Sequence, residues 1–321
     1  MRTRTIAFFA APVMLAFVTA AAPAAGRVPY AGIVVFGTSL SDSGNAFELW
    51  GATNTPPDYL LDPLLVPSAP YARGGQHFSN GPTWVEQFAR SIGLAGSVRP
   101  AFVGSNPDAT NYAVGAARAR DDRINVNLPE QASSFLQQSG GMAAPDALYV
   151  IEIGGNDVRD ALVEYASGRD GGPILRAANE SIATSIQTLH GAGARTFLVW
   201  RTPNIGRTPA LRALDQVNPG AAQLATLVTQ AFNQGLDGIV AQLEALPGIE
   251  IDRLDAYALI EKLVARPADF GLTNVTRACL TPTIAPFSCQ TPDEFLFWDG
   301  IHPTRAVHAI TAREAGHALA R

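Results

Sequence analysis

The sequence has little charge and almost no lysine. Charged residues make up 16% of its 321 residues, Lys262 is its only lysine, and the formal net charge is -5. A nucleic-acid surface normally shows a basic face or cluster, so we expect no nucleic-acid partner. With 47% hydrophobic residues and 29 scattered glycines, the chain is neither disordered nor collagen-like. It is therefore expected to fold around a sizeable core.

Several motifs are also missing. The sequence contains no Walker A pattern, no G-x-G-x-x-G and no H-E-x-x-H, which leaves nucleotide and zinc-protease functions without support. The absence of G-x-S-x-G argues against the nucleophile-elbow hydrolases. No C-x-x-C or paired histidines complete a zinc site with the two cysteines. We therefore expect neither a metal nor an organic cofactor.

The N-terminus has the pattern of a secretory signal. Arg2 and Arg4 precede an apolar stretch over residues 6–18, and Ala22-Pro23-Ala24 forms an A-x-A cleavage site. The alternative is an uncleaved membrane anchor, but the stretch is short for a span of about 20 residues. We expect a signal peptide over residues 1–24 and one soluble domain over residues 25–321. The mature protein is expected to be secreted or periplasmic.

The two cysteines fit an exported protein. Cys279 and Cys289 lie close together in a Pro-containing loop. Export places them in an oxidising compartment, where cysteines commonly form disulfides. We therefore expect them to pair, the alternative being two free thiols.

Apolar, β-branched runs alternate with segments of helical spacing, which is the pattern of an α/β fold. The predicted strands are 32–36, 147–153, 196–200, 249–254 and a weaker one at 111–114. The predicted helices are 82–92, 174–190, 223–246 and 304–319. Strands separated by helices indicate a parallel sheet covered on both faces. Residues 51–75 and 266–298 are expected to form long loops over this single domain.

Ser39 is a candidate nucleophile because it follows the first predicted strand directly. Ligands bind beyond the carboxyl ends of strands in an open parallel sheet, so substrates can reach a serine placed there. If a helical turn begins at Ser39, its own N–H could also help to bind an oxyanion. The alternative is a serine that only caps the following helix.

A serine hydroxyl needs a base, and His302 is the best candidate among the five histidines. Asp299 lies three residues before it, so its carboxylate can reach Nδ1 and leave Nε2 free for the serine proton. The other four histidines lack such a carboxylate neighbour and are expected to be surface or packing residues. They are His77, His190, His308 and His317.

Two further polar positions follow predicted strands. Asn156 lies in Gly154-Gly155-Asn156-Asp157, where its amide can donate to a developing oxyanion. Gly115 follows the weak strand at 111–114, where its backbone N–H could be another donor. Either segment could instead be an ordinary turn, because Gly and Asn are common turn residues.

These four segments, in this order, resemble the blocks of the SGNH or GDSL family of serine esterases and lipases. They are residues 36–45, 111–117, 154–157 and 299–302, and residues 78–84 also resemble the larger lipase-like members. The resemblance covers nearly the whole mature chain. It implies a three-layer α/β/α sandwich with a flavodoxin-like, five-stranded parallel sheet. It also implies Ser39 as nucleophile, His302 as base, Asp299 as its orienter, and Ser39, Gly115 and Asn156 as the oxyanion hole.

One position departs from the family pattern. The family usually has Asp before the nucleophile, whereas this chain has Thr38, although Asp42 is retained. The base in this mechanism is the histidine, so the loss of that carboxylate need not abolish catalysis.

The resemblance implies an exported carboxylic-ester hydrolase with an acyl-serine intermediate, acting on a small-molecule or lipid ester. We expect a monomer that makes transient contact with membrane surfaces. Apolar residues of the two long loops favour an acyl-chain pocket, the alternative being that they only pack the loops down; they are Leu60, Leu61, Leu64, Leu65, Val66 and Phe287. Two alternatives stay open: a carbohydrate acetyl esterase, and a catalytically silent binding protein on the same fold.

Overall fold

A four-stranded parallel sheet forms the centre of the computed structural model, which describes residues 30–103, 106 and 108–320. The strands lie in the order β1-β2-β3-β4, and each pairs with its neighbour in parallel. Their bounds are β1 Ile33–Gly37, β2 Leu148–Glu152, β3 Thr196–Arg201 and β4 Glu250–Asp255. These four strand predictions are confirmed. The predicted signal peptide, residues 1–24, lies outside the described residues.

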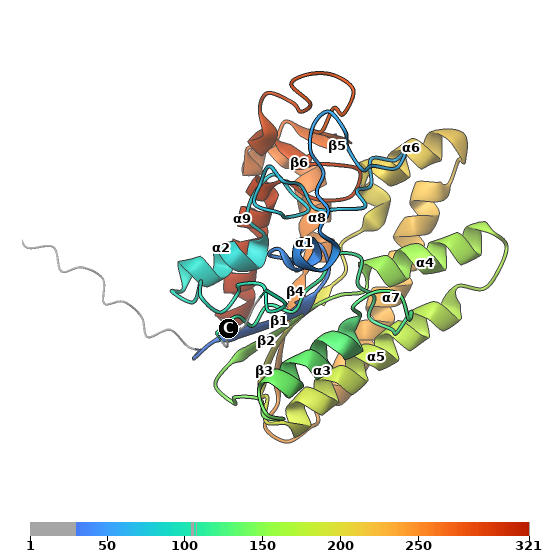
Figure 1. The fold of residues 1–321 in the computed structure, drawn as a ribbon. Coiled ribbons are helices and arrows are strands. Elements are labelled where there is room, and N and C mark those ends of the chain that lie inside the picture. The colour runs from blue at the N-terminus through green and yellow to red at the C-terminus, as the bar shows by residue number, and fades with distance from the viewer. Residues whose placement is uncertain (1–29, 104–105, 107, 321) are drawn as a thin grey trace, which may run out of the picture.

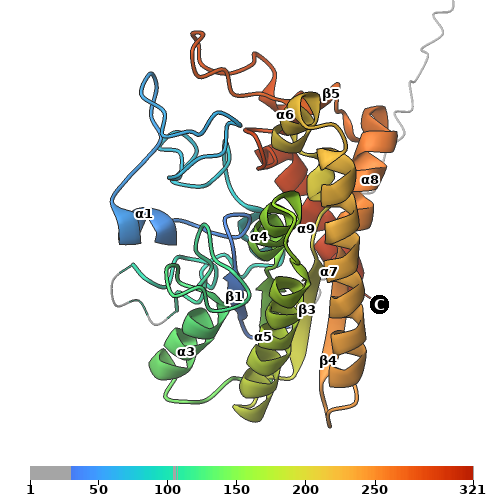
Figure 2. The ribbon, with the colours of Figure 1, turned by 90° about the vertical axis from the view of Figure 1, so that its right-hand side faces the viewer.

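Helices cover both faces of the sheet, so the predicted three layers are confirmed (Figures 1 and 2). One face carries α2 (Trp84–Ser91) and α9 (Arg305–Leu319). The other carries α3 (Leu128–Gln138), α4 (Gly155–Ala166), α5 (Gly172–Gly191) and α7 (Ala221–Leu243). The four helices predicted from the sequence correspond to α2, α5, α7 and α9.

The core divides into two clusters because successive side chains of a strand point to opposite faces. Along β1, Ile33 and Val35 pack with residues of α2 and α9, whereas Val34 and Phe36 pack with those of α3, α4, α5 and α7. All five residues of β1 are buried. A strand buried on both faces has an uninterrupted apolar sequence, which is why these strands could be found from composition.

The predicted fifth strand at 111–114 is wrong as a strand. The segment runs beside β1, where the N–H groups of Tyr112 and Val114 donate to Val35 and Gly37, but only an isolated bridge at Asn111 forms. The Asn111 side chain accepts the N–H of Ala113 at 3.0 Å, and such local bonds compete with a strand ladder. With this segment in the place of a strand, the order would be 2-1-3-4-5, the flavodoxin-like order.

The segment expected as a loop at 266–298 contains a second, two-stranded parallel sheet, which the sequence analysis missed. It consists of β5 (Asn274–Ala278) and β6 (Phe295–Phe297). The remaining helices are α1 (Asn45–Trp50), α6 (Pro209–Val217), α8 (Ala256–Ala265), η1 (Ile205–Arg207), η2 (Pro267–Phe270) and η3 (Pro292–Glu294). Among the described residues, no helix combines the length and the apolar character that crossing a bilayer requires.

Candidate active site

Ser39 lies in a tight turn immediately after β1. The N–H groups of Ser41 and Asp42 both donate to the carbonyl oxygen of Thr38, at 3.1 and 3.0 Å, and these bonds close the turn around Ser39. The following helix, α1, begins only at Asn45, so Ser39 is not its N-cap. The serine is partly exposed, and its own N–H donates to no other described residue. Both its hydroxyl and its N–H are therefore available at the carboxyl end of the sheet.

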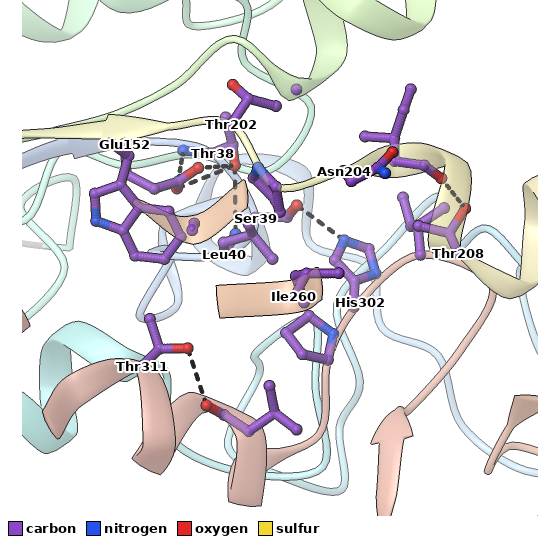
Figure 3. A pocket seen from close by; sticks show the side chains of 18 of the residues that line it. Thr38, Ser39, Leu40, Glu152, Thr202, Asn204, Thr208, Ile260, His302 and Thr311 are labelled. Carbon is purple, nitrogen blue, oxygen red and sulfur yellow. Dashed lines mark hydrogen bonds between the residues drawn. The ribbon is translucent and has the colours of Figure 1, made fainter. Parts of the chain in front are cut away.

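The structure brings Ser39, His302 and Asp299 together in a chain of hydrogen bonds. His302 Nε2 lies 2.8 Å from Ser39 Oγ, and His302 Nδ1 lies 2.8 Å from Asp299 Oδ2 (Figure 3 shows the first contact). His302 is 3% exposed and Asp299 is fully buried. The charge of Asp299 keeps the proton on Nδ1, so Nε2 is the nitrogen that can accept a proton from the serine.

Tyr71 also contacts Asp299, and the sequence analysis missed it. Its hydroxyl donates to Asp299 Oδ2 at 2.9 Å, while the N–H groups of Ile301 and His302 donate to Oδ1 at 2.8 and 2.7 Å. Burial, together with the charge of Asp299, holds the pKa of Tyr71 well above its usual value, so the phenol keeps its proton. These contacts fix the orientation of the Asp299 carboxyl group.

The turn that carries Asp299 and His302 is packed against the long loop at 51–75. The N–H of Gly300 donates to the carbonyl of Leu65 at 2.9 Å. A Cβ at Gly300 would overlap the carbonyl oxygen of Leu64, so only glycine fits here. The ring of Phe78 lies against that of His302, with centroids 5.4 Å apart. Leu65 and Phe78 therefore help to hold His302 in place.

Asn156 lies beside these residues, as predicted. It is the second residue of α4, which starts directly beyond β2, and it lines the same cavity as Ser39 and His302. Its Nδ2 donates to the carbonyl of Ala117 at 2.9 Å, and its Oδ1 accepts from Arg159 at 3.3 Å. These two contacts fix the orientation of the amide and leave the second N–H of Nδ2 for a ligand.

Gly115 does not present a free N–H to the site. Its N–H donates to Asp42 Oδ2 at 2.8 Å, and Gly115 is not among the residues that line the cavity. The glycine is needed for packing instead, because a Cβ at this position would overlap the ring of Phe78. Burial raises the pKa of Asp42 to about 6, opposed by the N–H groups of Gly44, Gly115 and Ala46 that it accepts. Asp42 thus organises the turn around Ser39.

Comparison with known proteins shows the family of this chain. Residues 33–315 match the family described as GDSL-like Lipase/Acylhydrolase. The chain belongs to this family.

Relatives in the GDSL family include proteins of three bacteria. The chain is 30% identical to an uncharacterized protein of Pseudomonas putida over 88% of its own length and 48% of that protein's. It is 26% identical to the thermolabile hemolysin of Vibrio parahaemolyticus over 88% and 62% of the two lengths. It is 25% identical to the phosphatidylcholine-sterol acyltransferase of Aeromonas hydrophila over 90% of each. The chain thus spans about half of the first of these relatives.

Glu152 explains how this member of the GDSL family accommodates Thr38. Glu152 is the last residue of β2, paired with Gly37 of β1, and it is 4% exposed. Its carboxyl group accepts the N–H of Thr38 at 3.0 Å and the Thr38 hydroxyl at 3.0 and 3.1 Å. Burial raises the pKa of Glu152 to about 7. A carboxyl group is therefore present beside residue 38, but it comes from the neighbouring strand.

The cavity at Ser39 is lined mainly by apolar side chains of β3, η1, α6, α8, β6 and α9 (Figure 3). They include Trp200, Ile205, Leu211, Leu259, Ile260, Phe297, Ile301 and Val307. The loop residues predicted to form an acyl pocket, Leu60 to Val66 and Phe287, are not among them. Leu64 and Val66 instead pack against the core. Of the two segments expected as long loops, only 266–298 contributes to the described wall, through Phe297 of β6.

Two histidines near the site differ in their surroundings. His77 has a carboxylate neighbour after all, because its Nε2 lies 2.9 Å from Glu86. Burial alone would lower the pKa of His77, but the hydrogen bond and charge of Glu86 raise it. His308 is a packing residue, and burial lowers its pKa to about 3, so its ring is neutral. No His, Cys, Asp and Glu side chains in the described ranges cluster to hold a metal ion.

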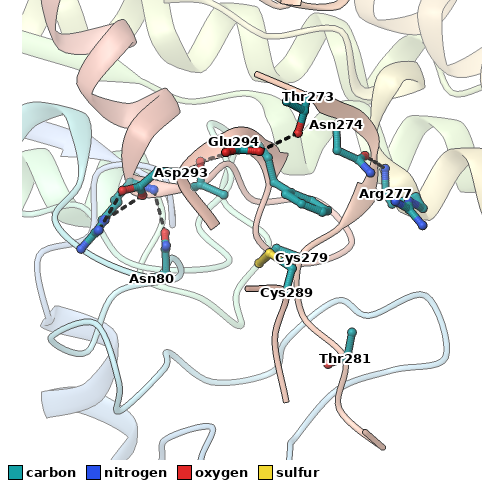
Figure 4. Close-up of a disulfide and its surroundings, with 12 residues drawn as sticks. Asn80, Thr273, Asn274, Arg277, Cys279, Thr281, Cys289, Asp293 and Glu294 are labelled. Atoms are coloured by element: carbon teal, nitrogen blue, oxygen red, sulfur yellow. Dashed lines mark hydrogen bonds and ion pairs between the residues drawn. A yellow bond between two sulfur atoms is a disulfide. The ribbon is translucent and has the colours of Figure 1, made fainter. Parts of the chain in front are cut away.

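Cys279 and Cys289 form the predicted disulfide (Figure 4). The bridged segment pairs with the residues that precede Asp299, because the N–H of Cys279 donates to Phe297 at 3.0 Å and that of Leu280 to Trp298 at 2.8 Å. The bridge therefore closes a loop whose first residues are hydrogen-bonded to the segment just before Asp299.

We expect removal of this bridge to affect the site before it affects the fold. The double variant Cys279→Ser, Cys289→Ser should lose ester hydrolysis at temperatures where its far-UV circular dichroism persists. Small displacements of catalytic groups can lower a rate about 10²-fold, and the loosened segment is hydrogen-bonded next to Asp299. Simultaneous loss of activity and ellipticity on heating would limit the bridge to global stability.

Proposed function

We propose that this chain is an exported carboxylic-ester hydrolase that forms an acyl-serine intermediate. The observation that carries the proposal is the hydrogen-bonded chain from Ser39 through His302 to Asp299. Membership of the GDSL-like Lipase/Acylhydrolase family supports the reaction class. The N-terminal signal pattern and the disulfide support export.

The proposed reaction has two steps. Ser39 Oγ attacks the acyl carbonyl carbon and passes its proton to His302 Nε2, while Asp299 stabilises the imidazolium through Nδ1. The tetrahedral intermediate then expels the alcohol, which takes the proton from Nε2. Water repeats the sequence on the acyl-serine and releases the carboxylic acid.

The negative charge on the tetrahedral oxygen needs hydrogen-bond donors. We propose the N–H of Ser39 and Nδ2 of Asn156 for this role, because both retain an N–H without a partner among the described residues. Gly115 could join only if Asp42 released its N–H.

We expect Asn156→Ala to lower kcat by about 10²- to 10³-fold with little change in KM, the usual cost of losing one oxyanion donor. Steady-state kinetics on a p-nitrophenyl ester measures both constants, and circular dichroism checks the fold. A loss confined to KM would assign Asn156 to substrate binding instead.

The apolar cavity favours an acyl chain over an acetyl group as the substrate's acid part. Side chains such as Leu211, Leu259 and Ile260 gain free energy by covering methylene groups, about 0.8 kcal/mol for each one buried. An acetylated carbohydrate would leave these apolar side chains exposed to water. The acyltransferase among the relatives makes transfer to an alcohol a variant of the same chemistry.

A chain-length series tests this function. We expect kcat/KM for p-nitrophenyl esters to rise from acetate to medium-length acyl chains. A maximum at acetate, together with release of acetate from acetylated xylan, would favour a carbohydrate esterase. No turnover of any ester by the folded protein would favour a binding protein. We further propose that the protein acts as a monomer and meets lipid substrates at membrane surfaces.

A further inference from the structure

Arg159 lines the same cavity as Ser39, Asn156 and His302. It follows Asn156 by one turn of α4, and its Nη1 donates to Asn156 Oδ1 at 3.3 Å. This long contact is the only hydrogen bond that its guanidinium forms with the described residues, and it forms no ion pair with them. A cationic side chain with several unused N–H groups therefore lines the cavity that contains Ser39.

Unlike Arg159, two neighbouring arginines form ion pairs. Arg118 contacts Asp160 at 3.1 Å, and Arg120 contacts both Asp157 at 2.9 Å and Asp160 at 2.7 Å. Asp160 is the residue next to Arg159 in sequence, but both of its oxygens are occupied by the other two arginines. The acidic side chains in the first turns of α4 are thus paired with Arg118 and Arg120 rather than with Arg159.

The other carboxylates whose charge acts on Arg159 are also engaged elsewhere. They are Asp62 and Asp299, and both lie beyond ion-pair distance. Asp62 Oδ1 accepts the N–H groups of Leu64 and Val66, each at 2.8 Å. Asp299 is held by His302 and the other donors described above. Among the described residues, no carboxylate forms an ion pair with this guanidinium.

An unpaired cation inside a protein is costly, and an anion that completes its hydrogen bonds removes that cost. Burial and the charge of Arg118 lower the pKa of Arg159, and the charges of Asp160, Asp62 and Asp299 oppose this shift only in part. The N-terminus of α4, at Gly155 and Asn156, adds favourable potential for negative charge at the same wall.

We propose that Arg159 binds a negatively charged group of the substrate, a carboxylate or a phosphate, during ester hydrolysis. This inference rests on the proposed function and adds a substrate class to it: anionic rather than neutral esters. Because the apolar wall suits the acyl chain, the charge belongs to the alcohol part of the ester.

Matched esters test the proposal. The wild type and Arg159→Met are compared on p-nitrophenyl butanoate, on the same ester with a carboxylate on its phenyl ring, and on p-nitrophenyl hydrogen glutarate, at one ionic strength. We expect Arg159→Met to lose about 10- to 100-fold more kcat/KM on the ring-carboxylate ester than on the neutral one. Taking the ratio of variant to wild type for each ester cancels differences in intrinsic reactivity.

Two further variants serve as controls. Arg159→Lys keeps the charge and should retain a large part of the preference. Arg169→Met removes an exposed arginine that lies just beyond α4 and is paired with Glu164, and its ratio to the wild type should be the same for all three esters. An equal loss on all three esters would overturn the proposal, because Arg159 would then only orient Asn156. A selective loss on the glutarate ester alone would overturn the assignment of the charge to the alcohol part.

Equilibrium binding tests the anion site without depending on ester hydrolysis. By calorimetry, octyl phosphate should bind the wild type at least about tenfold more tightly than Arg159→Met, whereas octanol should bind both equally. If no ester is hydrolysed, the proposed function fails, but this comparison still decides the anion site. Equal affinity of octyl phosphate for both proteins would overturn it.

Discussion

Ser39→Ala is expected to lower kcat for ester hydrolysis by about 10⁵- to 10⁶-fold, because no acyl-serine can form without the Oγ atom. The fold should be unchanged. Ser39 is partly exposed in a turn that is closed by hydrogen bonds to the Thr38 carbonyl. Among the described residues, its hydroxyl forms a hydrogen bond only with His302. Hydrolysis of a p-nitrophenyl ester gives the rate, and far-UV circular dichroism reports the fold.

Ser43→Ala is the matched control for this variant. Ser43 lies just after this turn, and among the described residues its hydroxyl accepts a hydrogen bond only from the Asn111 amide, at 2.9 Å. Its replacement should leave kcat within a few-fold of the wild type. Retention of most activity by Ser39→Ala would mean that Ser41 or Ser43 carries the acyl group, and the mechanism proposed above would be wrong.

Asp299→Asn is expected to have the next largest effect, a fall in kcat of about 10⁴-fold. The amide keeps the size of the side chain but carries no charge to stabilise the imidazolium, and its N–H₂ group can favour the wrong tautomer of His302. The carboxylate also accepts Tyr71 and two backbone N–H groups, so its geometry is set by more than the histidine. Steady-state kinetics at saturating ester measures the effect.

Tyr71→Phe separates the effect of the Asp299 charge from the effect of the hydrogen bond that positions Asp299. It removes one donor to Asp299 and leaves the contact of Asp299 with His302 in place. We expect a loss of less than about tenfold, since one neutral hydrogen bond is worth about 1 kcal/mol. If Asp299→Asn lost no more than Tyr71→Phe, the charge of Asp299 would have no special part in catalysis.

The parts of the site that could be predicted are local in sequence or lie at strand ends. Asp299 and His302 are three residues apart, and Ser39 and Asn156 each follow a strand whose apolar run is unmistakable. Parallel strands bring their carboxyl ends to one edge of the sheet, so these residues had to meet there. The same reasoning placed Gly115 near the site but could not show that Asp42 takes its N–H.

The parts that could not be predicted depend on contacts between distant segments. Tyr71 reaches Asp299 across 228 residues of sequence, and Glu152 reaches Thr38 across 114. A glutamate in a buried, otherwise apolar strand was the one local signal for Glu152. Part of the cavity wall comes from η1, α6 and α8. These helices are too short to show a clear helical periodicity in a single sequence.

Labelling with a fluorophosphonate tests the central claim most directly, because the probe phosphonylates only an activated serine and needs no knowledge of the natural ester. The account predicts that the folded protein takes up the probe on the peptide that contains Ser39, as identified by mass spectrometry, and that Ser39→Ala takes up none. A label on Ser41 or Ser43, or no label on a protein that still hydrolyses p-nitrophenyl esters, would contradict it.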